Sequence, residues 1–167
     1  MIICHSNQGI IPLSDLTVIG HSIFLAGPTP RDNSIVSWRP EALSILERLN
    51  YDGVVFVPEP FGQDYLYQVN WEKCGLTAAS VIVFWVPRVK WVMAGLTTNV
   101  EFGRYIGSKR VLYGRPDAAE SCKYLDWMYS DVTKKTHYND LGELLEKAVV
   151  FNRKIRVTDK PSGLMIG

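Results

Sequence analysis

The chain of 167 residues is long enough to bury one hydrophobic core without disulfides or metals, so we expect a single domain over residues 1–167. Hydrophobic residues make up 47% and charged residues 21%, a balance that excludes disordered, fibrous and low-complexity proteins. The formal net charge of +1 predicts no attraction to nucleic acid polymers or anionic membranes and favours a small-molecule ligand.

Four short apolar runs predict buried strands. They cover residues 23–26, 54–57, 81–86 and 110–113, and each stops at a glycine or a proline. Because a strand that is covered on both faces is apolar throughout, we expect these strands to lie inside a sheet. The leader, residues 1–20, is either irregular or adds an edge strand.

Segments with helical spacing of apolar residues lie between and after these runs. We expect helices at residues 37–50, 65–79, 100–106, 118–129 and 141–152, followed by an irregular tail, residues 155–167, suited to packing on another subunit. Alternating strands and helices predict an α/β fold with a parallel sheet and helices on both faces. Trp85 and Trp127 lie in apolar segments and are expected in the core, whereas Trp91 lies in an apolar loop suited to a lid or a subunit contact.

In open parallel sheets, ligands bind beyond the carboxyl ends of the strands. The chain leaves the expected strands there at residues 27–31, 58–62, 87–88 and 114–116, so we look for function in these loops first. No glycine-rich phosphate loop, zinc-protease motif or serine-hydrolase motif occurs, and we expect no cofactor.

The cysteines and the N-terminus bear on the cellular compartment. Cys4, Cys74 and Cys122 are odd in number and lack the spacing of a zinc site, which predicts reduced thiols and no metal. The first residues lack a basic region followed by an apolar stretch, and no apolar run is long enough to span a bilayer. We expect a cytoplasmic protein.

The segment 96–103, Leu-Thr-Thr-Asn-Val-Glu-Phe-Gly, contains the strongest candidate for a catalytic residue, Glu101. It follows an expected strand and opens a helix, so Glu101 in the first helical turn points into the crevice, and Gly103 allows a close approach of the helix to the sheet or a ligand. However, Thr98-x-x-Glu101 is also a capping box, in which the glutamate merely satisfies backbone donors. On spacing alone, capping is the commoner explanation.

Three segments together resemble the nucleoside 2-deoxyribosyltransferase family. They are Phe24-Leu-Ala-Gly-Pro28, Ala79-Ser-Val-Ile-Val83 and Asn99-Val-Glu-Phe-Gly103, and the resemblance spans roughly residues 22–116. It implies a flavodoxin-like, Rossmann-like doubly wound sheet of about five strands and a homo-oligomer with shared active sites. It also implies Glu101 as a nucleophile and, at Glu72, an acid that contacts the base; a solvated helix carboxylate remains the alternative for Glu72.

The implied chemistry explains a carboxylate at this place. Cleavage of an N-glycosidic bond builds positive charge at the anomeric carbon, which a carboxylate stabilises and then captures as a glycosyl ester. A base or a water molecule attacks that ester, and protonation of the departing base by a second acid assists the first step. Besides Glu72, the candidates for the second acid are Asp64 and Glu59.

Further substrate contacts are expected at the strand exits and at the start of the catalytic helix. The candidates are Gly27, Pro28, Arg31, Glu59, Ser80, Arg88, Thr98 and Asn99. Arg31 and Arg88 suit a phosphate through paired hydrogen bonds, although solvated surface arginines are commoner.

The sequence therefore favours an enzyme that cleaves or transfers the N-glycosidic bond of a nucleoside or nucleotide through a glycosyl-glutamate. One alternative is a non-catalytic sensor or regulatory domain that binds a nucleotide-like ligand. Another is an interaction protein in which Glu101 is a helix cap.

Overall fold

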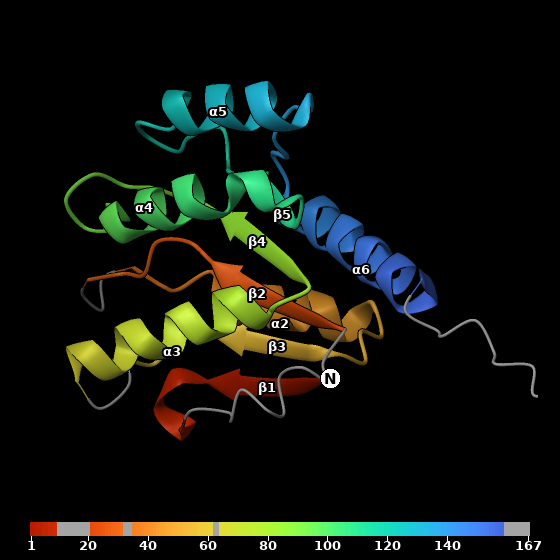
Figure 1. Ribbon diagram of the computed structural model, residues 1–167. Helices are drawn as coiled ribbons and strands as arrows, with labels where there is room; N and C mark the ends of the chain where they lie inside the picture. The colour runs from red at the N-terminus through yellow and green to blue at the C-terminus, as the bar shows by residue number, and fades with distance from the viewer. Residues whose placement is uncertain (10–20, 32–34, 62–63, 159–167) are drawn as a thin grey trace, which may run out of the picture.

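The structure is a computed structural model that describes residues 1–9, 21–31, 35–61 and 64–158, with side chains described up to residue 154. Within these residues five parallel strands form one sheet in the order β1-β3-β2-β4-β5 (Figure 1). The strands are β1 (Ile2–His5), β2 (Ser22–Ala26), β3 (Val54–Val57), β4 (Val81–Trp85) and β5 (Val111–Gly114). The expected doubly wound parallel sheet is confirmed, and β1 is an edge strand within the leader.

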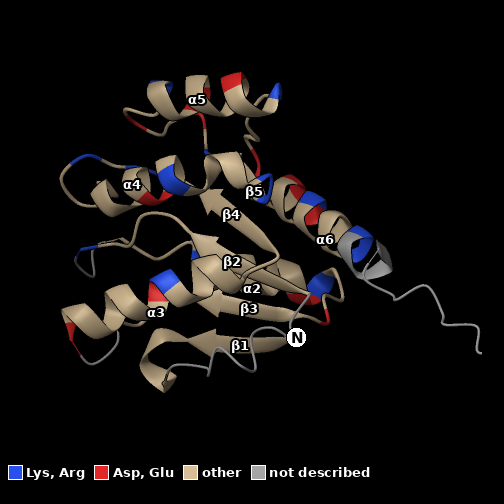
Figure 2. Ribbon diagram, viewed as in Figure 1, with Lys and Arg blue, Asp and Glu red and all other residues tan. Residues whose placement is uncertain are grey.

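Helices cover both faces of the sheet (Figure 1). They are α2 (Arg39–Arg48), α3 (Tyr65–Ala78), α4 (Leu96–Tyr105), α5 (Lys123–Thr133) and α6 (Leu141–Thr158), with short 3-10 turns η1 (Ser6–Gln8) and η2 (Ile106–Ser108). The five strands contain no Asp, Glu, Lys or Arg, and the charged residues lie on the helices and loops (Figure 2). No helix of the described residues has the length and apolarity needed to cross a membrane.

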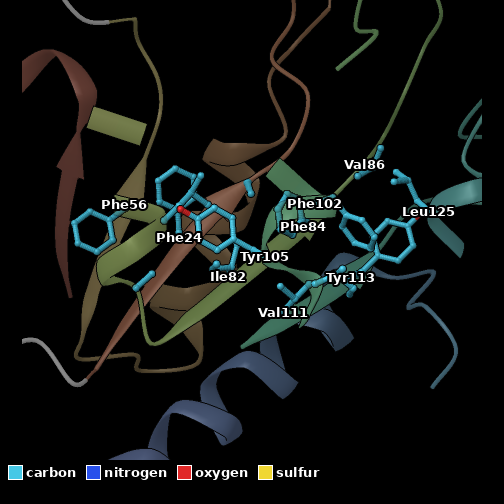
Figure 3. Close-up of a cluster of buried hydrophobic side chains, with 14 of the residues drawn as sticks. Phe24, Phe56, Ile82, Phe84, Val86, Phe102, Tyr105, Val111, Tyr113 and Leu125 are labelled. Atoms are coloured by element: carbon cyan, nitrogen blue, oxygen red, sulfur yellow. The ribbon is translucent and has the colours of Figure 1, made fainter. Parts of the chain in front are cut away.

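Two hydrophobic cores lie on opposite faces of the sheet. On one face, α2 and α6 pack through residues such as Leu46 and Leu144. On the other face, α3, α4 and α5 cover a row of aromatic rings (Figure 3). Within that row the ring of Phe102 lies 5.2 Å from Phe84 and 5.1 Å from Tyr113, both edge to face. This row fixes α4, the helix that bears Glu101, against β4 and β5.

The strand order changes direction at β2, and this positions the site. The chain leaves β2 through α2 to reach β3 on one side, then returns through α3 to β4 on the other side of β2. The helices that follow β2 and β4, α2 and α4, therefore lie on opposite faces of the sheet, and a crevice opens at its carboxyl edge.

Three expectations from the sequence need correction. The helix expected at 118–129 begins only at Lys123, because a turn closed by the Ala119 amide on the Pro116 carbonyl and a left-handed Ser121 (φ 55°) precede it. Trp127 is 59% exposed rather than in the core, whereas Trp85 is buried. The expected tail from residue 155 is still helical up to residue 158, and its remainder, with the expected subunit contact, lies outside the described residues.

Candidate active site

A cavity of about 630 Å³ opens at the carboxyl edge of the sheet, between α3 and α4. Its walls come from the loop after β2, the exit of β3, the first turns of α3 and the first turns of α4. Of the residues expected to contact substrate or reacting atoms, six line it: Gly27, Pro28, Arg31, Glu72, Thr98 and Glu101.

Glu101 stands in the second turn of α4, not in the first. The helix begins at Leu96 after Gly95, a left-handed residue (φ 62°) that caps the helix without any side-chain hydrogen bond. The expected capping box is therefore wrong, because Thr98 already lies inside the helix. The expected close approach at Gly103 is also wrong, since an added Cβ atom there meets nothing within 4 Å.

Glu72 faces Glu101 from the neighbouring helix α3. Both carboxyl groups line the cavity and are hydrogen-bonded to each other. The Gln68 side chain, one turn earlier on α3, donates its Nε2 hydrogen bonds to Oε1 of Glu72 (2.7 Å) and to the carbonyl of Pro58 (3.2 Å). Gln68 thus ties the Glu72 carboxyl to the exit of β3.

Burial makes the two carboxyl groups hold a proton at neutral pH. Desolvation, with the charge and hydrogen bond of Glu72, raises the pKa of Glu101 to about 8, and Arg39 opposes this rise. Desolvation likewise raises the pKa of Glu72, against the hydrogen bond from Gln68 and the charge of Arg39. The carboxyls titrate as a pair, which combines one acid and one carboxylate at the same point of the cavity.

Arg39 lies beneath the cavity and is 1% exposed. Its Nη1 atom contacts Oε1 of Glu59 at 2.5 Å, and its other hydrogen bonds reach carbonyl groups at the end of β2. Sequence reasoning missed Arg39 and Gln68. A signal was available for Arg39, which shares the inward face of the amphipathic helix α2 with Ala42 and Leu46. Gln68 is buried with Trp71 and Gly75, but α3 has no clear apolar face in its sequence that would have shown this.

The loop after β2 forms the wall of the cavity opposite α3. Gly27 has φ 151°, and a Cβ atom there would clash with the carbonyl oxygen of Trp85 on β4. Pro28 packs so closely on Gly95 that a Cβ atom at Gly95 would lie 2.7 Å from its ring. The amide of Arg31 donates to the Val92 carbonyl at 3.0 Å. The loops after β2 and β4 therefore form one connected wall.

Four residues expected to contact substrate do not line this cavity. Ser80 lies at the amino end of β4, the opposite edge of the sheet, where its amide donates to Oγ of Ser22 at 3.0 Å. The buried Arg88 donates to Oδ1 of Asn99 (2.5 Å), which joins the loop after β4 to α4. Glu59, the fourth, reaches the cavity only through its ion pair with Arg39.

Two further expectations concern acids and metals. Asp64, a candidate second acid, lines the cavity but caps α3 by accepting from the amide of Tyr67 at 2.8 Å. Within the described part of the chain, no group of three or more His, Cys, Asp or Glu residues is arranged to hold a metal ion.

Comparison with known proteins agrees with this geometry. A family model described as nucleoside 2-deoxyribosyltransferase like matches residues 20–118, which is more than half of the chain and spans β2 to β5. The matched region contains every wall of the cavity. A comparison with curated proteins returned no match. The chain belongs to the nucleoside 2-deoxyribosyltransferase-like family.

Proposed function

We propose that the protein cleaves the N-glycosidic bond of a nucleoside or nucleotide and passes the sugar to a base or to water. The observation that carries this proposal is the hydrogen-bonded pair of Glu72 and Glu101 at the carboxyl edge of the sheet. Such a pair supplies a nucleophile and a proton donor together, and the family to which the chain belongs supports this use.

The raised pKa of Glu101 places the shared proton on Glu101 at neutral pH, so the proton first passes to Glu72 along the hydrogen bond between the two carboxyls. In the first chemical step, a Glu101 carboxylate oxygen attacks the anomeric carbon while the bond from that carbon to the base nitrogen breaks. The bonding electrons leave with the base, which takes a proton from the carboxyl of Glu72. In the second step, water or an acceptor base attacks the anomeric carbon, the ester bond to Glu101 breaks, and the proton of the attacking group passes to Glu72. Each carboxyl returns to its starting state.

The remaining walls of the cavity suit a sugar and its substituents. Thr98, Gly27 and Pro28 lie on the side of the loop after β2, and Arg31 supplies a cation in that loop. A phosphate on the sugar would neutralise Arg31, which is exposed and forms no ion pair with an acidic side chain among the described residues. We infer that Arg31 distinguishes nucleotides from nucleosides.

Exposed apolar side chains stand at the mouth of the cavity and support a homo-oligomer. On α3 these are Tyr65 (80% exposed), Leu66 (71%) and Val69; on α4 they are Leu96 and Val100 (72%). A monomer rarely leaves such a group in water, and a second copy placed over it would close the site. The unpaired Cys4, Cys74 and Cys122 suit a reducing, cytoplasmic location.

One assay tests the proposed function. The protein is incubated with nucleosides, deoxynucleosides, their 5′-monophosphates and NAD, with and without an acceptor base, and released base is measured by chromatography. We expect release from at least one substrate, its loss in Glu101→Gln and Glu72→Gln, and normal activity in Glu47→Gln, which removes an exposed carboxylate of α2. Acid-quenched reactions analysed by intact mass should contain a glycosyl adduct that Glu101→Gln lacks.

Each other outcome counts against the proposal. Full turnover by Glu101→Gln removes Glu101 as the nucleophile. No release from any substrate removes the catalytic proposal, and thermal stabilisation by one compound of the panel would then select a ligand-binding domain without turnover.

A further inference from the structure

A buried ion pair lies beneath the cavity, and the two chemical steps above do not use it. Arg39 is 1% exposed and Glu59 17%, and Nη1 of Arg39 lies 2.5 Å from Oε1 of Glu59. We propose that Arg39 is a positioning residue that fixes the loop after β2 and, with Glu59 opposing its charge, stabilises the single carboxylate of the reacting pair. The catalytic consequence rests on the proposed function, but the electrostatic claim does not.

The first half of the proposal is geometric. Arg39 donates from Nε to the Leu25 carbonyl (3.1 Å), from Nη2 to Gly27 (2.8 Å), and from Nη1 to the Pro28 carbonyl (3.4 Å) and Thr29 Oγ1 (3.1 Å). All four acceptors belong to the end of β2 or to its exit loop. A planar guanidinium matches acceptors spread in this way, and a lysine ammonium does not. Arg39 thus determines the position of the loop after β2, the wall of the cavity opposite α3.

The second half is electrostatic. The charge of Arg39 acts on Glu59 most strongly, then on Glu72 and Glu101, and it opposes the rise in pKa of both cavity carboxyls. The negative charge of Glu59 lies beside Arg39 and opposes the positive potential of Arg39 at the other two carboxyls. The Arg39–Glu59 pair is therefore placed to set how much positive charge the cavity carboxyls experience.

Two other charged groups line the same cavity. Arg31 lies in the loop after β2 and is exposed, while Asp64 accepts from a backbone amide at the start of α3. Neither is among the groups that shift the pKa of Glu101. Arg39 is the one cation among those groups, so its removal should raise the pKa of Glu101.

Fold stability alone gives a weaker account of the ion pair. Replacing a buried ion pair by apolar groups of similar volume is often neutral or stabilising, because the pair loses the hydration of two charges. Fixing a loop is therefore a weak reason to bury the charge of Arg39. The burial is better explained if the charge also acts on the two cavity carboxyls, Glu72 and Glu101.

The test is a double-mutant cycle read without turnover. Protein labelled with ¹³C at the glutamate carboxyls is titrated by NMR, and Glu101 is assigned by the signal lost in Glu101→Gln. Glu59→Gln leaves the Arg39 charge uncompensated, so we expect the Glu101 midpoint to fall by about one pH unit, a tenfold change in the acid constant. Arg39→Met should raise that midpoint, in the wild-type background and in the Glu59→Gln background alike.

Outcomes that overturn the proposal are distinct from failure of the proposed function. An unchanged Glu101 midpoint in Glu59→Gln, or an unchanged or lower midpoint in Arg39→Met, overturns it even if the enzyme releases base. Conversely, the predicted cycle can hold in a protein that turns nothing over. If Arg39→Met alone does not fold, the double variant Arg39→Met/Glu59→Gln is compared with Glu59→Gln. The proposal requires the Glu101 midpoint to be higher in the double variant.

Discussion

Glu101→Gln should make the folded protein more stable in alkaline solution. Burial raises the pKa of Glu101 from its ordinary 4.5 to about 8, so the folded protein keeps a proton that the unfolded chain has lost. Between these pH values the unfolded state binds fewer protons, and the free energy of unfolding falls as the pH rises. Glutamine has nearly the same shape and no charge, so it removes this fall.

The size of the effect follows from the width of that pH window. Each unit of pKa difference corresponds to about 1.36 kcal/mol. The window is about 3.5 units wide, which gives roughly 5 kcal/mol for an isolated group. Because Glu101 titrates together with Glu72, we expect the observed gain to be about 3–5 kcal/mol at pH 9 and close to zero at pH 5. This is a large share of the stability of an ordinary domain.

The assay is urea denaturation followed by tryptophan fluorescence, since Trp38, Trp71 and Trp85 are buried. Wild type, Glu101→Gln and the exposed control Glu47→Gln are compared at pH values from 5 to 9. The reasoning is refuted if wild-type stability is flat over this range. It is equally refuted if Glu101→Gln is the less stable protein at every pH, since the carboxylate would then make a stabilising contact.

Four further substitutions test separate parts of the structure. Gly27→Ala should destabilise the fold by about 2–4 kcal/mol, because φ is positive at Gly27 and the added Cβ atom meets a carbonyl oxygen of β4. Gly103→Ala should stabilise the fold by up to about 1 kcal/mol, because Gly103 lies in a helix and its added Cβ atom faces open space. Equal changes of the unfolding free energy in the two variants, measured by urea denaturation, would contradict this contrast. Burial raises the pKa of Glu72, and the hydrogen bond from Gln68 opposes that rise, so Gln68→Leu should raise the pKa of Glu72 further. A lower pKa of Glu72 in this variant, measured by NMR titration, would refute the contact. Burial favours the neutral form of Asp126, but hydrogen bonds from Arg115 and Tyr113 hold the pKa of Asp126 below its usual value. Asp126→Asn should therefore lower the free energy of unfolding by about 1 kcal/mol at pH 7. That difference should vanish as the pH falls through the folded pKa, and a difference that persists in acid would exclude the ionic contribution.

The strands could be predicted from the sequence because their signal is local. Val54–Val57 is continuously apolar and ends at a proline, and the strand occupies these same residues. Val81–Trp85 ends one residue before the expected boundary. The edge strand Ile2–His5 was harder to predict, because one neighbour and partial exposure leave it without a continuous apolar run.

The cavity could be predicted only in part, because side-chain contacts between elements leave little trace in one sequence. The positions of Glu72 and Glu101 on two helices carried a signal, but their hydrogen bond depends on how α3 and α4 pack. Ser80 was misplaced because a motif shared with a family does not say which end of a strand faces the ligand. Arg39 was passed over as a helix residue, although it lies inward with Ala42.

The correction to α4 bears on why a glutamate at this position is reactive. A carboxylate in the first turn accepts hydrogen bonds from free backbone amides and lies at the positive end of the helix, which favours its ionised and fully bonded form. In the second turn the amides are already bonded within the helix, so Glu101 receives no such stabilisation. Its carboxyl instead meets Glu72 across a cavity that excludes much of the water, which raises its pKa. The placement that removes the capping explanation is therefore the same placement that leaves the carboxyl oxygens available to a substrate.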